Sequence, residues 1–381
     1  MSWESVRADV FCESVRDGTH DTPKEAENGY KLVTAKHIRD GQVYPEEAYN
    51  ISEKDYLKIC ERSKVEQWDV LMSMIGNGLG RSAVVKEPAS YAIKNLALFK
   101  VGDEVKARWL HYFLSSEVGQ GMIYNSLQGS GQPFISLNLL RAFPIPTPQY
   151  AIMKSVVDIV SKYDELIENN QKQIKLLEEA AQRLYKEWFV DLRFPGHETT
   201  PITDGIPEGW TEGTLVDLAV FERGKTITKG QVNEGNVPVV AGGLEPAYYH
   251  DTPNTDAPVI TVSGSGANAG FTRMYYTEVW ASDCSYIDVS VTHDIAWIYC
   301  FLKENKASID SMQKGAAQPH VYAKDLNAMK VVVPCDSLME QFRTAAEPMF
   351  SKIGKLEMQI KMLTEARDRL LPKLMNGEIE V

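Results

Sequence analysis

Apolar residues recur at alternating intervals of four and three positions along two segments of the chain, residues 151–192 and 337–381. This spacing places one apolar stripe along a helix and, when sustained over many turns, predicts a coiled-coil seam. A helix of about 35 residues spans roughly 50 Å at ~1.5 Å per residue. The predicted seam contains Val156, Val160, Tyr163, Ile167, Asn170, Ile174, Leu177, Ala181, Leu184 and Trp188 in the first segment, and Phe342, Ala346, Met349, Ile353, Leu356, Ile360, Leu363, Arg367, Leu370 and Leu374 in the second.

Two polar residues, Asn170 and Arg367, interrupt this seam. Buried polar residues at such positions fix the register of paired helices, whereas the alternative places both side chains in solvent. The helices either pair within the chain or form a zipper between two copies. Antiparallel pairing within the chain is favoured, because each helix follows a globular region of similar size. Pro348 predicts a kink, or a late start of the second helix near Glu347.

The two helical segments are copies of one another. QIKLLEEAAQRL, which begins at Gln173, and QIKMLTEARDRL, which begins at Gln359, are identical at eight of twelve positions and are 186 residues apart. The same offset relates GSGQP at 129–133 to GAAQP at 315–319, and an offset of 188 relates Trp109 to Trp297. An offset of about half the chain indicates duplication of a whole unit with pseudo-twofold symmetry, not a short solenoid repeat.

The regions before the two helices mix short apolar runs with glycine-rich turns, which indicates a mixed α/β (α+β) class. Strands are expected at 70–75, 96–100, 142–145, 259–262 and 329–333, and short helices at 108–115 and 295–303. The predicted organisation is a globular domain at 1–150, a central helix at 151–192, a linker at 193–209, a second globular domain at 210–336 and a C-terminal helix at 337–381.

The net charge of −12 is divided as −2 for residues 1–150, −3 for 151–204, −6 for 205–335 and −1 for 336–381. This balance argues against a protein that binds nucleic acid alone, because phosphate contacts need a basic footprint. Local basic patches, or a basic partner, would have to supply it. The chain has no long apolar run, no signal-like start and five scattered cysteines, so a cytoplasmic location is expected.

No motif assigns catalysis to the chain. Gly76-x-Gly78 is followed by Arg81 where a dinucleotide fingerprint needs glycine, and Gly224-Lys225 imitates a P-loop end without its earlier glycine. HExxH, GxSxG and paired-cysteine metal patterns are also missing. We therefore expect no catalytic residues, no metal site and no cofactor in this chain, and we interpret the glycine-rich loops as turns.

The helical segments are similar to the two conserved regions of type I restriction-modification specificity (S) subunits. The resemblance rests on AQRLYKEWFVDLRFPGHE at 181–198 and ARDRLLPKLMNGEIEV at 366–381, supported by Asp17-Gly18-Thr19-His20 and by 129–133. It implies two target-recognition domains that each read one half of a bipartite DNA site. It further implies paired antiparallel helices that set the spacer and dock two methyltransferase (M) subunits, which hold S-adenosylmethionine. Restriction (R) subunits would add ATP- and Mg-dependent cleavage, and the S subunit itself would be non-catalytic.

Polar and cationic side chains beside turns are the candidates for contact with bases, because Arg suits guanine edges and Asn or Gln suits adenine. The alternative for each is a solvated loop residue or a turn-stabilising hydrogen bond. The candidates are His20, Lys36, Arg39, Asn77, Arg81, Ser130 and Gln132 in the first domain, and Arg223, Lys225, Asn268, Arg273, Gln318 and His320 in the second.

Two other classes of protein compete with this interpretation. A coiled-coil adaptor or scaffold that does not bind DNA explains the acidity but not the two related globular domains. An enzyme with cofactors in the glycine loops is disfavoured by the incomplete motifs. Within the family, a modification-only complex that lacks R subunits is also open.

Overall fold

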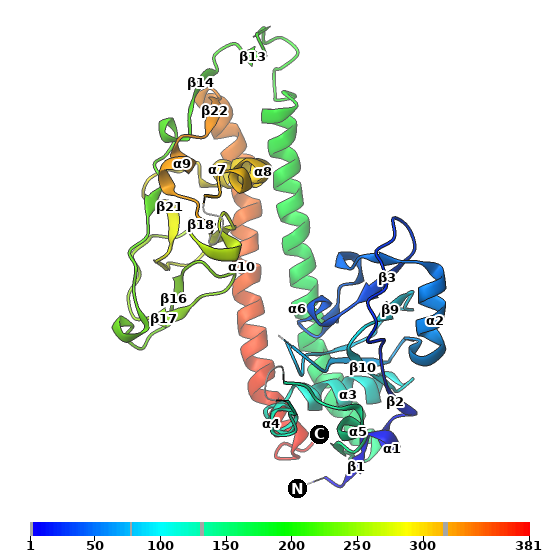
Figure 1. Ribbon diagram of the computed structural model, residues 1–381. Helices are drawn as coiled ribbons and strands as arrows, with labels where there is room; N and C mark the ends of the chain where they lie inside the picture. The colour runs from blue at the N-terminus through cyan, green and yellow to red at the C-terminus, as the bar shows by residue number, and fades with distance from the viewer. Residues whose placement is uncertain (1–2, 77, 130–132, 315–318) are drawn as a thin grey trace. The chain divides into compact units, whose positions relative to one another are not determined.

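The computed structural model describes residues 3–76, 78–129, 133–314 and 319–381. The chain divides into two compact units: unit 1 comprises Met1–Ile167 and Lys361–Val381, and unit 2 comprises Glu168–Ile360. Two long helices, α6 (Tyr150–Tyr185) and α10 (Asp336–Met375), each contribute residues to both units (Figure 1). None of the described helices is long and apolar enough to cross a membrane.

Unit 1 contains a four-stranded and a three-stranded sheet. The order of the larger sheet is β2-β10-β7-β8 with antiparallel neighbours, and that of the smaller is β6-β3-β9, in which β3 and β9 are parallel. The strands of these sheets and of the pairs β1-β11 and β4-β5 are β1 (Ser5–Arg7), β2 (Ser14–Asp17), β3 (Tyr30–Val33), β4 (Ile38–Arg39), β5 (Gln42–Val43), β6 (Asn50–Ile51), β7 (Val70–Ser73), β8 (Ser82–Val84), β9 (Tyr91–Ile93), β10 (Leu96–Lys100) and β11 (Pro144–Pro146). Its short helices are α1 (Ala8–Phe11), α2 (Glu53–Ser63), α3 (Glu104–Ser115), α4 (Glu117–Asn125) and α5 (Leu137–Arg141).

Unit 2 has the same sheet plan. Its four-stranded sheet has the order β15-β21-β18-β19, and its three-stranded sheet has the order β17-β16-β20 with β16 and β20 parallel. The strands of unit 2, including the pairs β12-β13 and β14-β22, are β12 (Ile202–Thr203), β13 (Ile206–Pro207), β14 (Thr211–Thr214), β15 (Glu222–Arg223), β16 (Val237–Val240), β17 (Tyr248–His250), β18 (Val259–Ser263), β19 (Thr272–Tyr275), β20 (Trp280–Ala281), β21 (Cys284–Asp288) and β22 (Lys330–Val333). Its short helices are α7 (Ile295–Glu304), α8 (Lys306–Ser311) and α9 (Ala323–Asn327).

The largest core of each unit joins the globular part to the long helices. In unit 1, Trp109 of α3 packs in a cluster with Val156 and Val160 of α6 and Leu374 of α10. In unit 2, Trp297 of α7 packs in a cluster with Ala181 of α6 and with residues of α10 that include Phe342 and Ile353. Seven buried residues of these two clusters belong to the predicted seam: Val156, Val160, Ala181, Phe342, Ala346, Ile353 and Leu374. No residue of the predicted seam is exposed.

The two polar seam residues join α6 to α10 within the separate units. Asn170 is 6% exposed and donates from Nδ2 to Gln359 Oε1 over 3.3 Å in unit 2. Arg367 donates from Nη1 to Asp164 Oδ1 over 2.8 Å in unit 1, where Tyr112 Oη donates to the other carboxylate oxygen. Both side chains therefore contact the facing helix.

The late start of the second helix is wrong, since α10 begins at Asp336 and continues through Pro348. Leu338, Met339 and Phe342 are buried, so packing holds the turns before the proline in helical form. The first helix ends in a π-helical segment at Lys186–Val190. The polar stretch after it is anchored by Phe194 and Trp210, which share a small core with Leu338.

A partly buried histidine predicts acid sensitivity of unit 1. His111 of α3 lies with Nδ1 2.9 Å from Ser82 Oγ, and burial lowers its pKa from 6.5 to about 4. Between these two values the unfolded chain binds a proton that the folded unit does not. The free energy of unfolding therefore falls as the pH drops through this window, by at most about 1.4 kcal/mol per pH unit, and the contribution is constant below it.

The measurement is the urea midpoint of unit 1, read by pulsed hydrogen exchange of α3 between pH 7 and pH 4.5. We expect His111→Gln to reduce the loss of stability in this window. The control is His293→Gln, which alters an exposed histidine of unit 2 and is expected to leave α3 unaffected. An identical pH dependence in His111→Gln and the parent chain would contradict the assignment.

Candidate nucleic-acid interface

A glycine holds two strands together at the same place in each unit. Gly18 N–H donates to the Leu96 carbonyl over 2.9 Å, and Gly224 N–H donates to the Cys284 carbonyl over 2.8 Å. A Cβ atom at Gly18 would lie 2.4 Å from the Ile93 carbonyl oxygen, and one at Gly224 would lie 2.3 Å from the Ser282 carbonyl oxygen. Only glycine allows the two backbone segments to approach this closely. The residues that follow each glycine, which are candidates for DNA contact, therefore lie beside the end of the four-stranded sheet.

In unit 1, His20 lies just after this glycine. Its Nδ1 is 2.9 Å from Asn95 Oδ1, and its Nε2 is 3.0 Å from the carboxylate of Asp17, while 64% of its side chain is exposed. Asp17 also accepts a hydrogen bond from Arg62. The ring is thus oriented by two neighbours and still presents a surface to solvent.

Arg81 occupies the second candidate position of unit 1. It follows the turn of Gly76, Gly78 and Gly80, which all have positive φ angles of 80–95°. Its exposed side chain lies over Gly78, and no hydrogen bond or ion pair to another described residue fixes the guanidinium. It is therefore free to bind an external acceptor.

Lys36 and Arg39 lie apart from these residues, in the 3-10 turn Ala35–His37 and in β4. Arg39 makes a two-pronged ion pair with Glu47 and stacks on Tyr44, so its charge is already compensated. The hydrogen bonds that it donates to Glu47 raise the pKa of the Arg39 guanidinium further above its usual value. Among described residues, no hydrogen bond or ion pair joins Arg39 to His20 or Arg81. Asn77, Ser130, Gln132 and Gln318 lie outside the described residues.

Three loops of unit 2 meet and bring three candidates together. Asn268 Nδ2 donates to the Gly242 carbonyl over 3.4 Å, and Arg273 Nη1 donates to the Leu244 carbonyl over 3.3 Å. His320 pairs through its backbone with Ser265 in the glycine-rich turn after β18. The cluster therefore combines an amide, a guanidinium and an imidazole.

Aromatic rings pack against several of these side chains. The Arg273 guanidinium lies 4.8 Å from the ring centre of Tyr275, and His320 stacks on Tyr322 at 5.8 Å. Lys225 lies 5.8 Å from the ring of Trp280, whose Nε1 donates to the Lys225 carbonyl. Arg223 is exposed on β15. Such contacts orient a cation without neutralising it, which leaves it available to nucleic acid.

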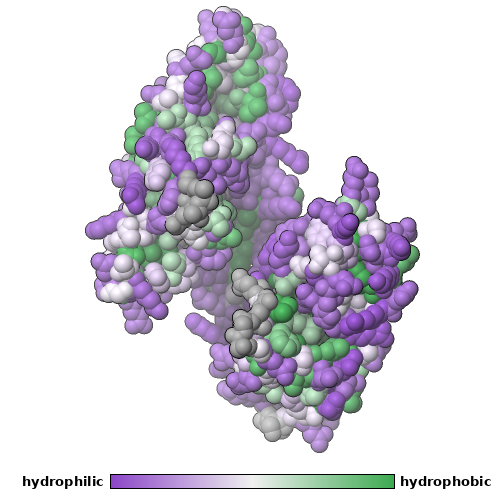
Figure 2. All heavy atoms as spheres, in the orientation of Figure 1, coloured by the Kyte–Doolittle hydropathy of each residue, from purple (hydrophilic) through white to green (hydrophobic). Residues whose placement is uncertain are grey.

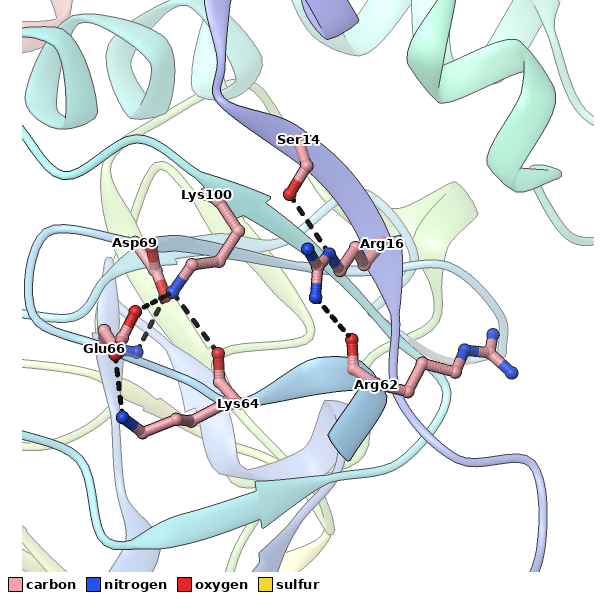
Figure 3. A network of polar contacts seen from close by, with 7 residues as sticks. All are labelled: Ser14, Arg16, Arg62, Lys64, Glu66, Asp69 and Lys100. Carbon is pink, nitrogen blue, oxygen red and sulfur yellow. Dashed lines mark hydrogen bonds and ion pairs between the residues drawn. The ribbon is translucent and has the colours of Figure 1, made fainter. Parts of the chain in front are cut away.

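Three arginines of unit 1 escaped the sequence analysis. Arg16, Arg62 and Arg141 line a cavity of about 370 Å³ together with Asp17 and Leu137. Figure 3 shows the Arg16 guanidinium between the Ser14 hydroxyl and the Arg62 carbonyl, with the Arg62 side chain directed away from Lys100. These residues are more than forty positions apart, and no local motif links them. Only the fold brings them to one cavity.

The neighbouring lysine belongs to an internal ion-pair network instead. Lys100 Nζ lies 2.7 Å from both Asp69 and Glu66, and Asp69 is 1% exposed (Figure 3). Burial raises the pKa of Asp69 against the effect of Lys100, and hydrogen bonds from Lys100 and Lys64 lower that of Glu66 to about 2. Lys100 therefore stabilises unit 1, and its charge is already compensated by Asp69 and Glu66.

The visible surface of each unit is largely hydrophilic, and its apolar side chains form small separate groups (Figure 2). Among the described residues, no group of three or more His, Cys, Asp or Glu side chains is placed to hold a metal ion. The polar loops at the ends of the four-stranded sheets are thus the best-defined candidate surface for a charged macromolecule.

Comparison with known proteins identifies the family. The model of the type I restriction modification DNA specificity domain matches residues 2–179 and 207–343, so the chain belongs to this family. The type I restriction enzyme MjaIX specificity subunit of Methanocaldococcus jannaschii is 25% identical over 390 residues, covering 94% of this chain and 86% of the relative. The HindI specificity subunit of Haemophilus influenzae is 22% identical over 408 residues, with coverage of 84% and 88%.

A solved structure shares the fold. The crystal structure of the type I restriction-modification S subunit from M. genitalium superposes with a TM-score of 0.58 at 17% identity, covering 98% of this chain and 96% of that one. The family and the mixed α/β fold predicted from the sequence are both confirmed.

Proposed function

We propose that this chain is the DNA specificity subunit of a type I restriction-modification complex, in which each unit reads one half of a bipartite DNA site. The observation that supports this most strongly is the repeated sheet plan, in which equivalent glycines of both units place polar loops beside the four-stranded sheet. A duplicated recognition fold matches a target with two halves.

The two halves of the site are proposed to differ in sequence. Unit 1 offers His20 and Arg81, whereas unit 2 offers Lys225, Asn268, Arg273 and His320. Arginine prefers guanine edges and asparagine prefers adenine. Because the donors of the two units differ in type and position, the same half-site cannot satisfy both.

The paired helices are proposed to set the number of unread base pairs. In this proposal α6 and α10 form an antiparallel coiled coil, and the pairs Asn170–Gln359 and Asp164–Arg367 fix its register. The repeats in sequence and in sheet order support this proposal. A rigid helical pair would then define one spacing, as fixed half-site spacing follows from protein geometry in other two-site DNA-binding proteins.

The outer helix faces are proposed to dock two M subunits. In unit 2, a groove of about 460 Å³ lies along α6 between Leu176 and Trp188, and Leu176 is 64% exposed. Met362 of α10 is 63% exposed in unit 1. The M subunits would hold S-adenosylmethionine and flip the target adenine. R subunits would use ATP and Mg, and this chain would perform no catalysis.

The adaptor that does not bind DNA is the weaker alternative. It accounts for the net charge of −12 but leaves the cationic loop clusters without a role. Membership of the specificity family favours DNA recognition.

Arginine substitutions test the reading of half-sites. We expect Arg273→Ala, assembled with M subunits, to relax one half of the methylated motif by about 1–3 kcal/mol of discrimination against the wrong base. Arg81→Ala should relax only the other half. The measurement is the base frequency at each motif position, from sequencing of methylated adenines.

Arg343→Ala is the matched control, because Arg343 lies on α10 in unit 2 and faces Asp294 instead of the loops. Its motif should be the same as that of the parent chain. A change spread equally over both half-sites in Arg273→Ala would contradict separate reading by the two units.

A further inference from the structure

The three arginines of the cavity in unit 1 are held by contacts that leave donors free. Arg141 uses Nε to donate to the Val15 carbonyl over 3.1 Å, and Arg16 uses one nitrogen each for Ser14 and the Arg62 carbonyl. Arg62 contacts Asp17 through Nη2. Since each guanidinium has five N–H groups, most of their donors are uncommitted.

The charge of the cavity is positive. Three guanidinium groups face one carboxylate, that of Asp17, which is 6% exposed and is also contacted by His20. Asp9 lies close enough to Arg141 to feel its charge, but it is already paired with Arg7. The remaining charge favours an anion, and planar guanidinium groups suit the oxygens of a phosphate.

Unit 2 provides an internal comparison. Asn327 lies 186 positions after Arg141 and contacts the backbone of Phe221. Phe221 lies three positions before Gly224, as Val15 lies three positions before Gly18. Asn327 satisfies both the N–H and the carbonyl of Phe221, at 2.8 and 3.0 Å. Arg141 and Asn327 therefore perform the same structural task, but only Arg141 adds a charge.

The other two arginines have no cationic equivalent in unit 2. The position equivalent to Arg16 is Glu222, given the alignment of Gly18 with Gly224. Arg62 lies in the last turn of α2, which lies between β6 and β7, and no helix is described between β17 and β18 of unit 2. The cavity is thus an addition to the common fold and not a part of it.

We infer that the cavity of Arg16, Arg62 and Arg141 binds a phosphate of the DNA backbone, a contact that unit 1 makes and unit 2 lacks. The inference rests on the proposed function. His20 connects the cavity to the candidate base-reading surface, because it contacts Asp17 on the cavity wall. The volume of about 370 Å³ holds a phosphate group with several waters, each of which takes ~30 Å³.

Arg141→Asn tests the inference with the residue that unit 2 uses at this position. Asn is able to keep a backbone contact while it removes the charge. In the complex with M subunits, at a duplex that carries the methylated motif, we expect affinity to fall about tenfold, with the motif unchanged. The slope of log affinity against log salt should become shallower by ~0.9, the value for one phosphate contact.

A second variant, Arg16→Gln, removes a charge from an exposed side chain. It tests the inference even if Arg141→Asn does not fold. Lys54→Gln is the matched control, because this exposed lysine lies two turns from Arg62 on α2. It should leave the slope unchanged. Duplexes with a single neutral methylphosphonate linkage should reveal one position where the parent complex loses affinity and the Arg141→Asn complex does not.

Each other outcome contradicts a specific statement. If the parent complex prefers its motif but neither cavity variant changes the salt slope, the inference is wrong and the proposed function stands. If Arg141→Asn weakens binding of inorganic phosphate alone and leaves DNA binding unaltered, the cavity is a site for a free anion and the inference is again wrong. If the parent complex shows no preference for any bipartite duplex, the proposed function fails as well.

Discussion

Lengthening both long helices is expected to shift the spacer of the recognised site. The change is an insertion of four residues in α6 between Asp164 and Asn170, together with four in α10 between Gln359 and Arg367. Four residues add about 6 Å of helix, which corresponds to ~2 base pairs at ~3.4 Å each. We expect the methylated motif to keep both half-sites and to gain about two unspecified base pairs between them.

The pairing of the insertions is essential to this experiment. Asn170 contacts Gln359 and Asp164 contacts Arg367, so matched insertions keep both pairs in register. The control is the insertion in α6 alone, which prevents both contacts from forming at once and should abolish methylation. Recovery of the original spacer with the paired insertion would show that the helices do not act as a ruler.

Removal of either core tryptophan is expected to destabilise its unit by about 3–5 kcal/mol, the usual cost of a large cavity. Trp109 and Trp297 are 0% and 2% exposed and occupy equivalent positions 188 residues apart. The measurement is the free energy of unfolding of each unit, read by hydrogen exchange in denaturant. Trp297→Ala should affect unit 2, and Trp109→Ala should affect unit 1.

Phenylalanine substitutions make a finer comparison at the same two sites. Trp109 Nε1 donates to the Pro146 carbonyl over 2.8 Å, whereas Trp297 Nε1 is buried and has no partner among the described residues. Trp109→Phe leaves a buried carbonyl without its donor, which costs about 1–3 kcal/mol. Trp297→Phe removes an unsatisfied donor, so it should cost less. An equal cost at the two sites would contradict the hydrogen-bond assignment.

Periodicity in the sequence predicted the elements that are long or strongly apolar. The strand expected at 96–100 is β10, the run at 70–75 contains β7, and the run at 259–262 lies within β18. All residues of these strands except Lys100 are buried, so an apolar run is a sufficient signal. The two-residue strands, such as β15 and β20, have no such pattern because their pairing depends on tertiary contacts.

The equivalence of the strands that precede the candidate loops was not visible in the sequence. β2 and β15 are related by an offset of 206, since Gly18 is equivalent to Gly224, whereas the later elements are related by 186 or 188. The extra length of unit 1 between these offsets includes helix α2, which has no described counterpart between β17 and β18 of unit 2. A search at a constant offset therefore misses the similarity between these two strands, which precede the candidate residues.

Residue type alone does not show whether the charge of an arginine is available to bind DNA or is already paired within the protein. Arg39 was a reasonable candidate until Glu47, eight positions later, proved to hold it. Arg16, Arg62 and Arg141 come from a strand, a helix end and a short helix, and only the fold brings them together. The net charge of the chain is negative, but these three arginines form a local positive patch. An acidic chain of the DNA specificity family can therefore still carry a basic site.

The most direct test of the central claim is the genome-wide map of methylated adenine in cells that express this chain with its cognate M subunit. The M subunit must be shown to be active with another specificity subunit. The account predicts a single motif with two short, different half-sites around a fixed gap. Methylation without a bipartite motif, or no new methylation despite a verified and assembled complex, would contradict it.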